Sequence, residues 1–151
     1  MYTLVRRYIK TAIAFLLVGL AIGTWMVVRR ELLLQAPTSF EVSAHTHAIA
    51  VGFVMMMILG VALWMFPRPD KSDTRYRPSH VEAAYWLLTV ATAARILAEL
   101  ARPYTASGVV RWAVVLASLG QVAGVALFFN TMWTRIRPVG SQQRERQGER
   151  F

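Results

Sequence analysis

The segment AHTHAIAVGFVMMMILGVALWMFPRP, residues 44–69, decides the fold of this chain. It opens with His45 and His47, continues as an apolar run whose only interruptions are two glycines, and ends at a Pro-Arg-Pro sequence. A run of roughly 20 apolar residues is long enough to cross the hydrocarbon core of a bilayer as a helix. Residues 44–66 therefore predict a transmembrane helix that carries two imidazoles at one end.

Three further apolar segments lie at about 8–28, 81–101 and 109–133. Because lipid leaves backbone groups no partner outside their own segment, each of them predicts a helix. We therefore expect an all-α protein, a four-transmembrane-helix bundle formed by residues 1–137. The chain is 56% hydrophobic yet has a net charge of +9, which is atypical of a soluble protein. It has no cysteine, so disulfides and thiolate chemistry are excluded.

The basic residues are distributed unevenly between the two sides of the predicted bundle. Twelve of the 17 lysines and arginines fall on the side that holds both termini, four fall on the other side, and Arg95 lies inside a span. The positive-inside rule predicts cytoplasmic N and C termini in a bacterial inner membrane. Residues 138–151 are polar and charged and predict a disordered basic tail. Since the charges flank spans, we expect contact with membrane lipid and none with nucleic acid.

The two histidines of the second span are expected to diverge. Thr38 and Glu41 have the spacing of a capping box, so the helix should begin before His45 and His47. Residues two apart on a helix point about 200° away from each other, which disfavours chelation of one metal by both. His80 opens the third span at the opposite face of the membrane, ~30 Å away.

The helix face below His45 carries Gly52, Met56 and Gly60. Glycines remove side-chain bulk, so a flat ring could lie against this face, and we interpret it as a porphyrin site with His45 as axial ligand. Two other interpretations stay open. Small residues also promote close packing between helices, and His45 with His47 could instead hold copper or zinc.

Residues 44–69 resemble the second helix of the catalytic subunit of haem-copper oxidases, most closely nitric oxide reductases and C-family oxidases. The shared features are the Ala-His or His-Thr start, a glycine some two turns later and an aromatic-Pro exit. The segment is also similar to NnrS-type membrane proteins, which repeat His-x-His before a glycine-containing helix. The resemblance implies that His45 ligates a low-spin b-type or a-type haem near the outer face, and that His47 corresponds to the second NnrS histidine.

The resemblance covers the second span and, loosely, the third, through YWLLTVATAARILAEL at residues 85–100. Oxidase catalytic cores have twelve helices and draw further histidines from later ones, so only a haem-binding half-site is implied here. We expect a haem b protein in electron transfer or in binding of nitric oxide or oxygen. Whether it is an enzyme is left open, and the alternative is a cofactor-free accessory or assembly subunit.

Two charged residues lie inside the third span. Arg95 and Glu99 are four residues apart at the depth of His45, so they can neutralise each other. Alternatively, the guanidinium of Arg95 can bind a haem propionate. Met26, at the same depth in the first span, is a further candidate for a soft axial ligand.

GxxxG motifs occur at residues 19–23 and 120–124 and serve either contacts within the chain or a dimer face. One chain supplies histidines at only one level of the membrane's outer half, whereas six-coordinate haem needs two axial ligands. We therefore expect a homodimer, the commonest closed assembly, with a redox protein or a larger respiratory complex as a further partner.

Overall fold

The computed structural model describes all residues except 1, 68–75, 137–139, 141–143, 145–146 and 149–151, and the described part is all-α. Its helices are α1 (Tyr2–Glu31), α2 (Ser39–His47), the π-helix η1 (Ala48–Met55), α3 (Met56–Met65), α4 (Pro78–Ala101), the 3₁₀ turn η2 (Arg102–Tyr104), α5 (Gly108–Met132) and the 3₁₀ turn η3 (Trp133–Arg135). The predicted tail falls largely outside the described residues.

Four of the described segments are long and apolar enough to cross a membrane. They are Thr3–Glu31, Ser39–Met65, Pro78–Tyr104 and Gly108–Arg135. The four predicted spans are therefore confirmed, although each helix extends beyond the apolar run that predicted it. The additional residues are mostly polar or charged, as helix ends at a membrane surface require.

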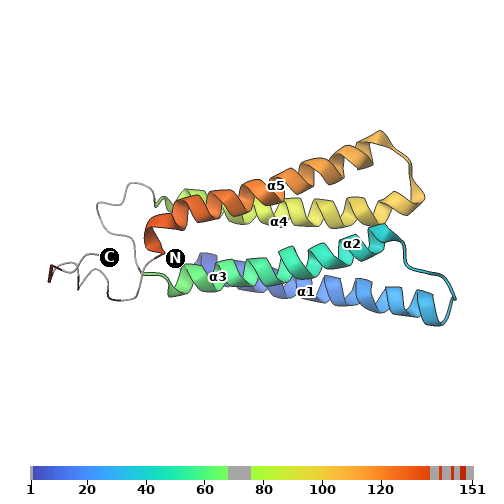
Figure 1. Cartoon of the computed structure of the whole chain (residues 1–151), viewed down its shortest axis with the longest axis horizontal. Coiled ribbons are helices and arrows are strands. Elements are labelled where there is room, and N and C mark those ends of the chain that lie inside the picture. Colours follow the sequence, from blue (N-terminus) through green and yellow to red (C-terminus); the bar gives the residue numbers. More distant parts are fainter. Residues whose placement is uncertain (1, 68–75, 137–139, 141–143, 145–146, 149–151) are drawn as a thin grey trace.

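The helices form two antiparallel hairpins packed side by side (Figure 1). One hairpin consists of α1 and the continuous rod α2–η1–α3, and the other consists of α4 and α5. The start of α1, the end of α3 and the end of α5 lie at one end of the bundle, and the connections 32–38 and 105–107 lie at the other. Which end faces the cytoplasm stays a prediction from the basic residues.

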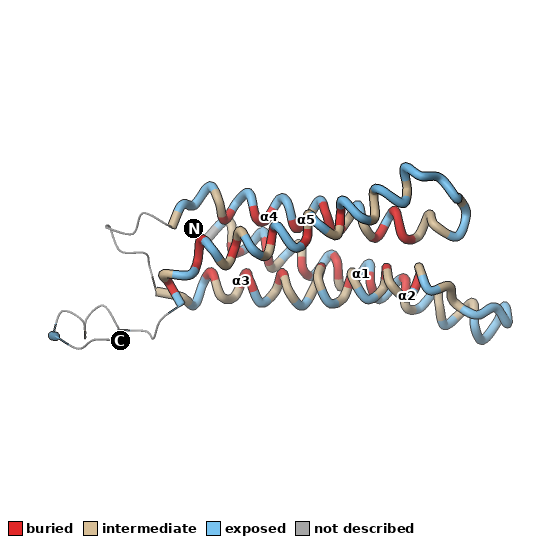
Figure 2. The backbone as a smooth tube through the Cα atoms, turned by 45° about the horizontal axis from the view of Figure 1, so that its top comes forward, coloured by how far each residue is buried: buried red, intermediate tan, exposed pale blue. Residues whose placement is uncertain are grey.

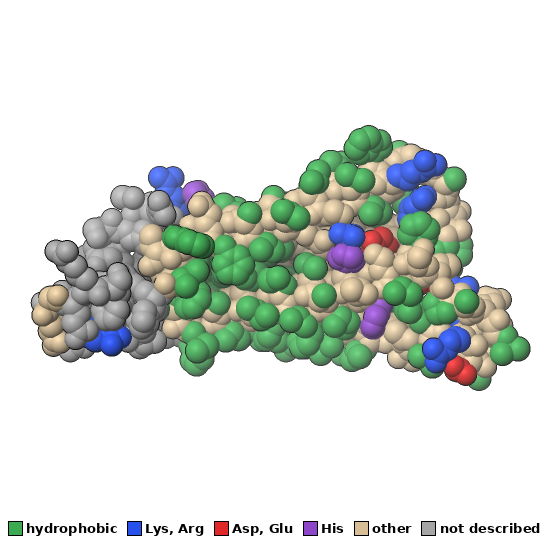
Figure 3. Space-filling model, viewed as in Figure 1, with side chains coloured by type: hydrophobic (Ala, Val, Ile, Leu, Met, Phe, Trp, Pro, Cys, Tyr) green, Lys and Arg blue, Asp and Glu red, His purple; other side chains and the backbone are tan. Residues whose placement is uncertain are grey.

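The core lies between the helices, and Tyr8 is one of its fully buried aromatic residues, with an exposed fraction of 0%. The Tyr8 ring centroid lies 5.1 Å from that of Tyr85 on α4 and 5.9 Å from that of Phe128 on α5. Buried residues turn toward the neighbouring helices (Figure 2). Large apolar side chains such as Leu17 and Leu119 are at least 60% exposed. Hydrophobic side chains cover much of the visible outside of the helices, as a lipid-facing surface requires (Figure 3).

The second GxxxG motif makes a contact inside the chain. A Cβ atom added at Gly120 would lie 2.9 Å from the Cβ of Ala91, and one added at Gly124 would lie 2.7 Å from Cγ of Leu88. Both partners belong to α4, so these glycines allow α5 to approach α4 closely. The first motif also faces a helix of the same chain, as the site described below shows.

The second span is not a uniform α-helix, because the eight residues Ala48–Met55 form a π-helix directly after His47. A π-helix has wider turns than an α-helix and is uncommon, and short π segments often occur near functional sites. The apolar pattern of this segment did not predict it. The rod nevertheless stays continuous into α3, so the span keeps its length.

Arg135 joins the end of α5 to the end of α3. Its side chain is 1% exposed and donates hydrogen bonds to the carbonyl oxygens of Pro67 at 2.8 Å and Phe66 at 3.0 Å. The guanidinium also lies 4.8 Å from the ring centroid of Tyr76. Arg135 also donates to the carbonyl oxygen of Leu63 at 3.4 Å, one of the final carbonyls of α3, which have no partner within the helix.

Candidate functional site

The helix that carries the histidines begins as predicted, at a capping box. The Thr38 hydroxyl accepts a hydrogen bond from the Glu41 amide at 3.2 Å, and the Glu41 carboxylate accepts one from the Thr38 amide at 2.7 Å. Glu41 is 3% exposed and also pairs with Arg29 of α1. The start of α2 is therefore held by the capping box within α2 and by the ion pair with α1.

The ring of His45 is bound to the neighbouring helix α1. Its Nδ1 atom lies 2.8 Å from the carbonyl oxygen of Gly19. A carbonyl can only accept a hydrogen bond, so Nδ1 must carry the proton, and in the neutral ring Nε2 then holds the lone pair. Nε2 has no hydrogen-bond partner among the described residues and is not sealed in the interior. It is therefore available to a ligand.

The space beside His45 is provided by Gly23, one turn after Gly19. A Cβ atom at position 23 would lie 2.9 Å from Cε1 and 3.2 Å from Nδ1 of His45. Side chains are not found that close to one another, so only glycine lets the imidazole lie against α1. The first GxxxG motif therefore makes an internal contact, and its two glycines bind and accommodate one histidine.

Residues of α1 lie against the glycines below His45, and at Gly52 the contact is with an aromatic ring. A Cβ atom at Gly52 would lie 2.6 Å from Cγ of Phe15, and one at Gly60 would lie 2.9 Å from Cβ of Tyr8. Gly52 thus makes close packing of α1 against η1 possible, which agrees with the interpretation that small residues on this face promote helix packing. Met56 is fully buried, with an exposed fraction of 0%.

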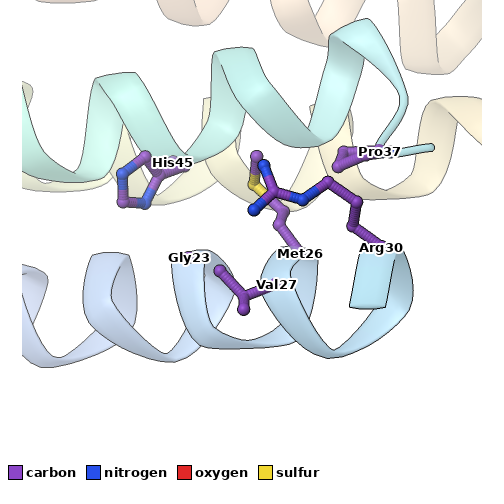
Figure 4. Close-up of a pocket in the computed structure, with 6 residues that line it drawn as sticks. All are labelled: Gly23, Met26, Val27, Arg30, Pro37 and His45. Carbon is purple, nitrogen blue, oxygen red and sulfur yellow. The ribbon is translucent and has the colours of Figure 1, made fainter. Parts of the chain in front are cut away.

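A cleft of about 350 Å³ opens between α1 and the start of α2 (Figure 4). His45 lies at one end of it, and the side chain of Arg30 extends from the other end toward Met26. Its lining residues are Gly23, Met26, Val27, Arg30, Pro37 and His45. The lining therefore offers one imidazole and one guanidinium in an otherwise apolar cleft.

His47 faces α4 and not the cleft. Its Nδ1 atom lies 2.8 Å from the carbonyl oxygen of Ser43, in its own helix, and 3.8 Å from Oε2 of Glu99. His45 and His47 thus engage different neighbours, in line with the predicted divergence. Among the described residues no group of three histidine, aspartate or glutamate side chains is arranged to hold a metal ion.

Arg95 belongs to a polar network that connects three helices. Its Nε atom donates to Oε1 of Glu99 at 3.0 Å, and its Nη1 atom donates to Oε1 of Gln121 on α5 at 3.2 Å. The same Glu99 oxygen accepts a hydrogen bond from the Ser43 hydroxyl of α2 at 2.8 Å, and Gln121 donates to Thr92 at 3.1 Å. Glu99 is 3% exposed. Arg95 and Glu99 therefore neutralise each other, and Arg95 does not line the cleft at His45.

Three residues around His45 did not enter the sequence-based site: Gly19, Gly23 and Arg30. The two glycines were noted as a motif, but the motif does not reveal which helix it faces. Their depth in the first span, equal to that of His45 in the second, was the signal that could have linked them. Arg30 was counted only for its charge.

Comparison with known proteins yields one match. The family model for cytochrome c and quinol oxidase polypeptide I matches residues 3–145, which include all four spans. No curated protein and no solved structure matches the chain. The match extends the resemblance seen in the second span to nearly the whole sequence.

Proposed function

The chain belongs to the cytochrome c and quinol oxidase polypeptide I family, that of haem-copper oxidase subunit I, and from this premise we propose that it binds a b-type haem through His45. Family membership and the four apolar helices make it a membrane protein related to haem-copper oxidases. The observation that carries the haem proposal is the hydrogen bond from His45 Nδ1 to the Gly19 carbonyl at 2.8 Å.

This hydrogen bond is the arrangement that an iron-ligating histidine needs. Metal-bound histidines generally donate their second ring N–H to a carbonyl or carboxylate, which fixes both the tautomer and the ring orientation. His45 is held in this way by a neighbouring helix, whereas His47 bonds within its own helix. The cleft beside His45 has a volume in the range of small-molecule sites and a largely apolar lining. The imidazole of His45 and the apolar lining support the haem proposal.

A bound haem supplies an iron that exchanges one electron or binds a diatomic gas such as nitric oxide or oxygen. The chain's own contribution is to present Nε2 of His45, to hold the ring with Gly19 and to surround the site with apolar side chains. Met26 lines the same cleft and is the candidate within the chain for a second axial ligand. The other source of a second ligand is a second copy of the chain.

The visible spectrum of the purified full chain tests the proposal. Wild type and His80→Ala should show the same Soret and alpha bands, because His80 lies at the opposite end of the bundle. His45→Ala should lose these bands, and His47→Ala should keep them.

Other results contradict the proposal. Loss of the bands in His47→Ala with retention in His45→Ala would assign the ligand to the other histidine. A protein without Soret absorption but with stoichiometric copper or zinc would be a metal protein of a different kind. Absence of both, after expression with added haem and metal, would leave a cofactor-free subunit.

A further inference from the structure

We propose that Glu99 is a positioning residue for His45: it holds the histidine-bearing helix α2 through the hydroxyl of Ser43 and thereby fixes the direction of the His45 ring. The inference rests on the proposed function, because it concerns the orientation of the proposed haem ligand. Its basis is the hydrogen bond that the Ser43 hydroxyl donates to Oε1 of Glu99 at 2.8 Å. Glu99 lies on α4 and is 3% exposed.

Helix α2 lies between α1 and α4 and contacts both of them (Figure 1). Residues two apart on a helix point about 200° away from each other, so Ser43 and His45 reach opposite neighbours. Ser43 bonds to α4, whereas Nδ1 of His45 lies 2.8 Å from the Gly19 carbonyl oxygen of α1. A rotation of α2 about its own axis would therefore disturb both bonds at once.

The rotation of α2 depends on the contacts that α2 itself makes. The helix has nine residues, and the π-helix η1 follows it directly. A π-helix has wider turns than an α-helix, so the period of α3 is not continued into α2. Among the described residues, Ser43 provides the one side-chain hydrogen bond from α2 to α4. Without it, the side-chain hydrogen bonds from α2 to other helices would all go to α1.

The ion pair with Arg95 makes Glu99 a firmly held acceptor. Charged residues inside membrane spans are costly and are usually functional. Arg95 neutralises Glu99 by donating from Nε to Oε1 at 3.0 Å, and Nη1 of Arg95 donates to Gln121 of α5 at 3.2 Å. The carboxylate is thereby anchored to two helices. Since a hydrogen bond to an ionised carboxylate is stronger than one to a neutral group, it ties Ser43 tightly to this anchor.

The two carboxylate oxygens of Glu99 are used unequally, which supports the same role. Arg95 and Ser43 both donate to Oε1, whereas Oε2 is buried and has no hydrogen-bond partner among the described residues. Nδ1 of His47 is 3.8 Å from Oε2, too far for a hydrogen bond. A carboxylate that served only as counter-charge to Arg95 would gain most by accepting through both oxygens. Its placement instead keeps Oε1 within reach of Ser43.

The test removes the Ser43 hydroxyl and observes His45 in the full-length apoprotein in detergent. Nitrogen NMR of protein labelled in its histidine rings reports the tautomer and the Nδ1–H bond of each ring, and the His45 signals are those absent in His45→Ala. Ser43→Ala should shift the His45 Nδ1 signal and allow the two tautomers to exchange, because the ring is no longer held toward Gly19. The Kd for haem b, from a Soret titration, should rise about threefold to tenfold.

Two variants are matched controls. Ser43→Thr keeps the hydroxyl and should retain the wild-type His45 signal and Kd. Thr46→Ala removes a hydroxyl of the same helix that donates to the Val42 carbonyl oxygen at 2.9 Å, and it should also leave both unchanged.

Glu99→Gln tests the acceptor directly. It reaches His45 only through Ser43, so it should shift the same His45 signal. In the Glu99→Gln background, the further change Ser43→Ala should have a smaller effect than in wild type, because the charged acceptor is already lost.

The role of Glu99 and the proposed haem site fail in different ways. An unchanged His45 signal in Ser43→Ala, an equal change in either control, or an undiminished effect of Ser43→Ala beside Glu99→Gln would each overturn the role of Glu99. Haem ligation by His45 would survive all three results. Absence of Soret binding by wild type would instead overturn the proposed function and leave the NMR comparison valid.

Discussion

The imidazole of His45 donates its Nδ1 proton to the carbonyl oxygen of Gly19 across a distance of 2.8 Å, from the second membrane span to the first. The ring is thus oriented by a helix to which it does not belong. Gly23 provides the space in which it lies. Any change in how α1 packs against α2 therefore acts directly on His45, the candidate ligand. The site can thus be tested by substituting the glycines of α1.

Substitution of Gly23→Ala should displace the His45 ring while leaving the bundle folded. The new Cβ would lie 2.9 Å from Cε1 of His45, so the ring must move. Overpacking of this kind costs ~1–3 kcal/mol, and we expect haem affinity to fall about tenfold or more. The measurement is a Soret titration.

Gly120→Ala is the matched control, because its Cβ would meet Ala91 at the same 2.9 Å, in the contact between α5 and α4 and not at His45. It should lower the stability of the α4–α5 contact without changing the haem spectrum. If Gly23→Ala binds haem as tightly as wild type does, the His45 ring in its position against Gly23 is not the haem ligand.

Removing one member of the Arg95–Glu99 pair should destabilise the bundle more than removing both. Glu99→Met leaves the guanidinium of Arg95 without its counter-charge in a place where the Arg95 side chain is only 19% exposed. Loss of one partner of a buried pair costs ~3–5 kcal/mol, whereas replacement of both by apolar residues is often close to neutral. The free energy of unfolding of each variant is measured in mixed micelles, by raising the fraction of a denaturing detergent.

The comparison requires Glu99→Met, Arg95→Met and the double variant. The double variant should recover most of the stability that each single variant loses. Strictly additive losses would show that the two side chains do not stabilise each other and that their contact is incidental.

The uneven distribution of basic residues predicts that the C terminus is cytoplasmic. A green fluorescent protein fused after Phe151 should be fluorescent in a bacterial host, and alkaline phosphatase fused at the same point should be inactive. Phosphatase fused after Gln35, in the connection between α1 and α2, should be active. Phosphatase activity at Phe151 would reverse the orientation and place His45 near the cytoplasmic face.

A homodimer with a shared haem is expected because the two histidines of one chain face different helices. Both GxxxG motifs make contacts inside the chain, so the contact between copies must use other residues. Native mass spectrometry in mild detergent should show a dimer, with a low-spin spectrum. Co-expressed wild-type and His45→Ala copies, purified through tags on both, should lose that low-spin signal.

The dimer prediction is wrong if the protein is a monomer with a bis-histidine spectrum. A monomer with a high-spin spectrum that shifts on addition of nitric oxide also contradicts the dimer. In that case the haem is five-coordinate, and the open position binds gas.

The spans and the start of the second helix could be predicted because their signals are local. Hydropathy over about 20 residues determines whether a segment can cross a membrane, and a capping box lies within four residues, Thr38 to Glu41. The π-helix could not be predicted. An α-helix and a π-helix differ in the number of residues per turn, and a continuous apolar run has no polar residues whose spacing would reveal that number. Its residues 48–55 are all apolar, and Gly52 among them packs against Phe15 of α1.

The site was only partly predictable because it depends on which helices are neighbours. His45 was identified from its own segment, but Gly19 and Gly23 act on it only because α1 packs beside α2. The role of Gly52 depends in the same way on Phe15, a residue 37 positions earlier in the chain. Arg135 was counted as an ordinary cytoplasmic charge, although it is buried against the end of α3.

The contact of Arg135 with the end of α3 also has a consequence for the order of assembly. Its carbonyl partners at Leu63, Phe66 and Pro67 leave the ribosome roughly 70 residues before it does, and chains generally begin to fold from the N-terminal side during synthesis. The first hairpin is therefore synthesised before Arg135 is available to bind these carbonyls. Binding of Arg135 then marks completion of the bundle, and a chain truncated before position 135 should remain a substrate for membrane quality-control proteases.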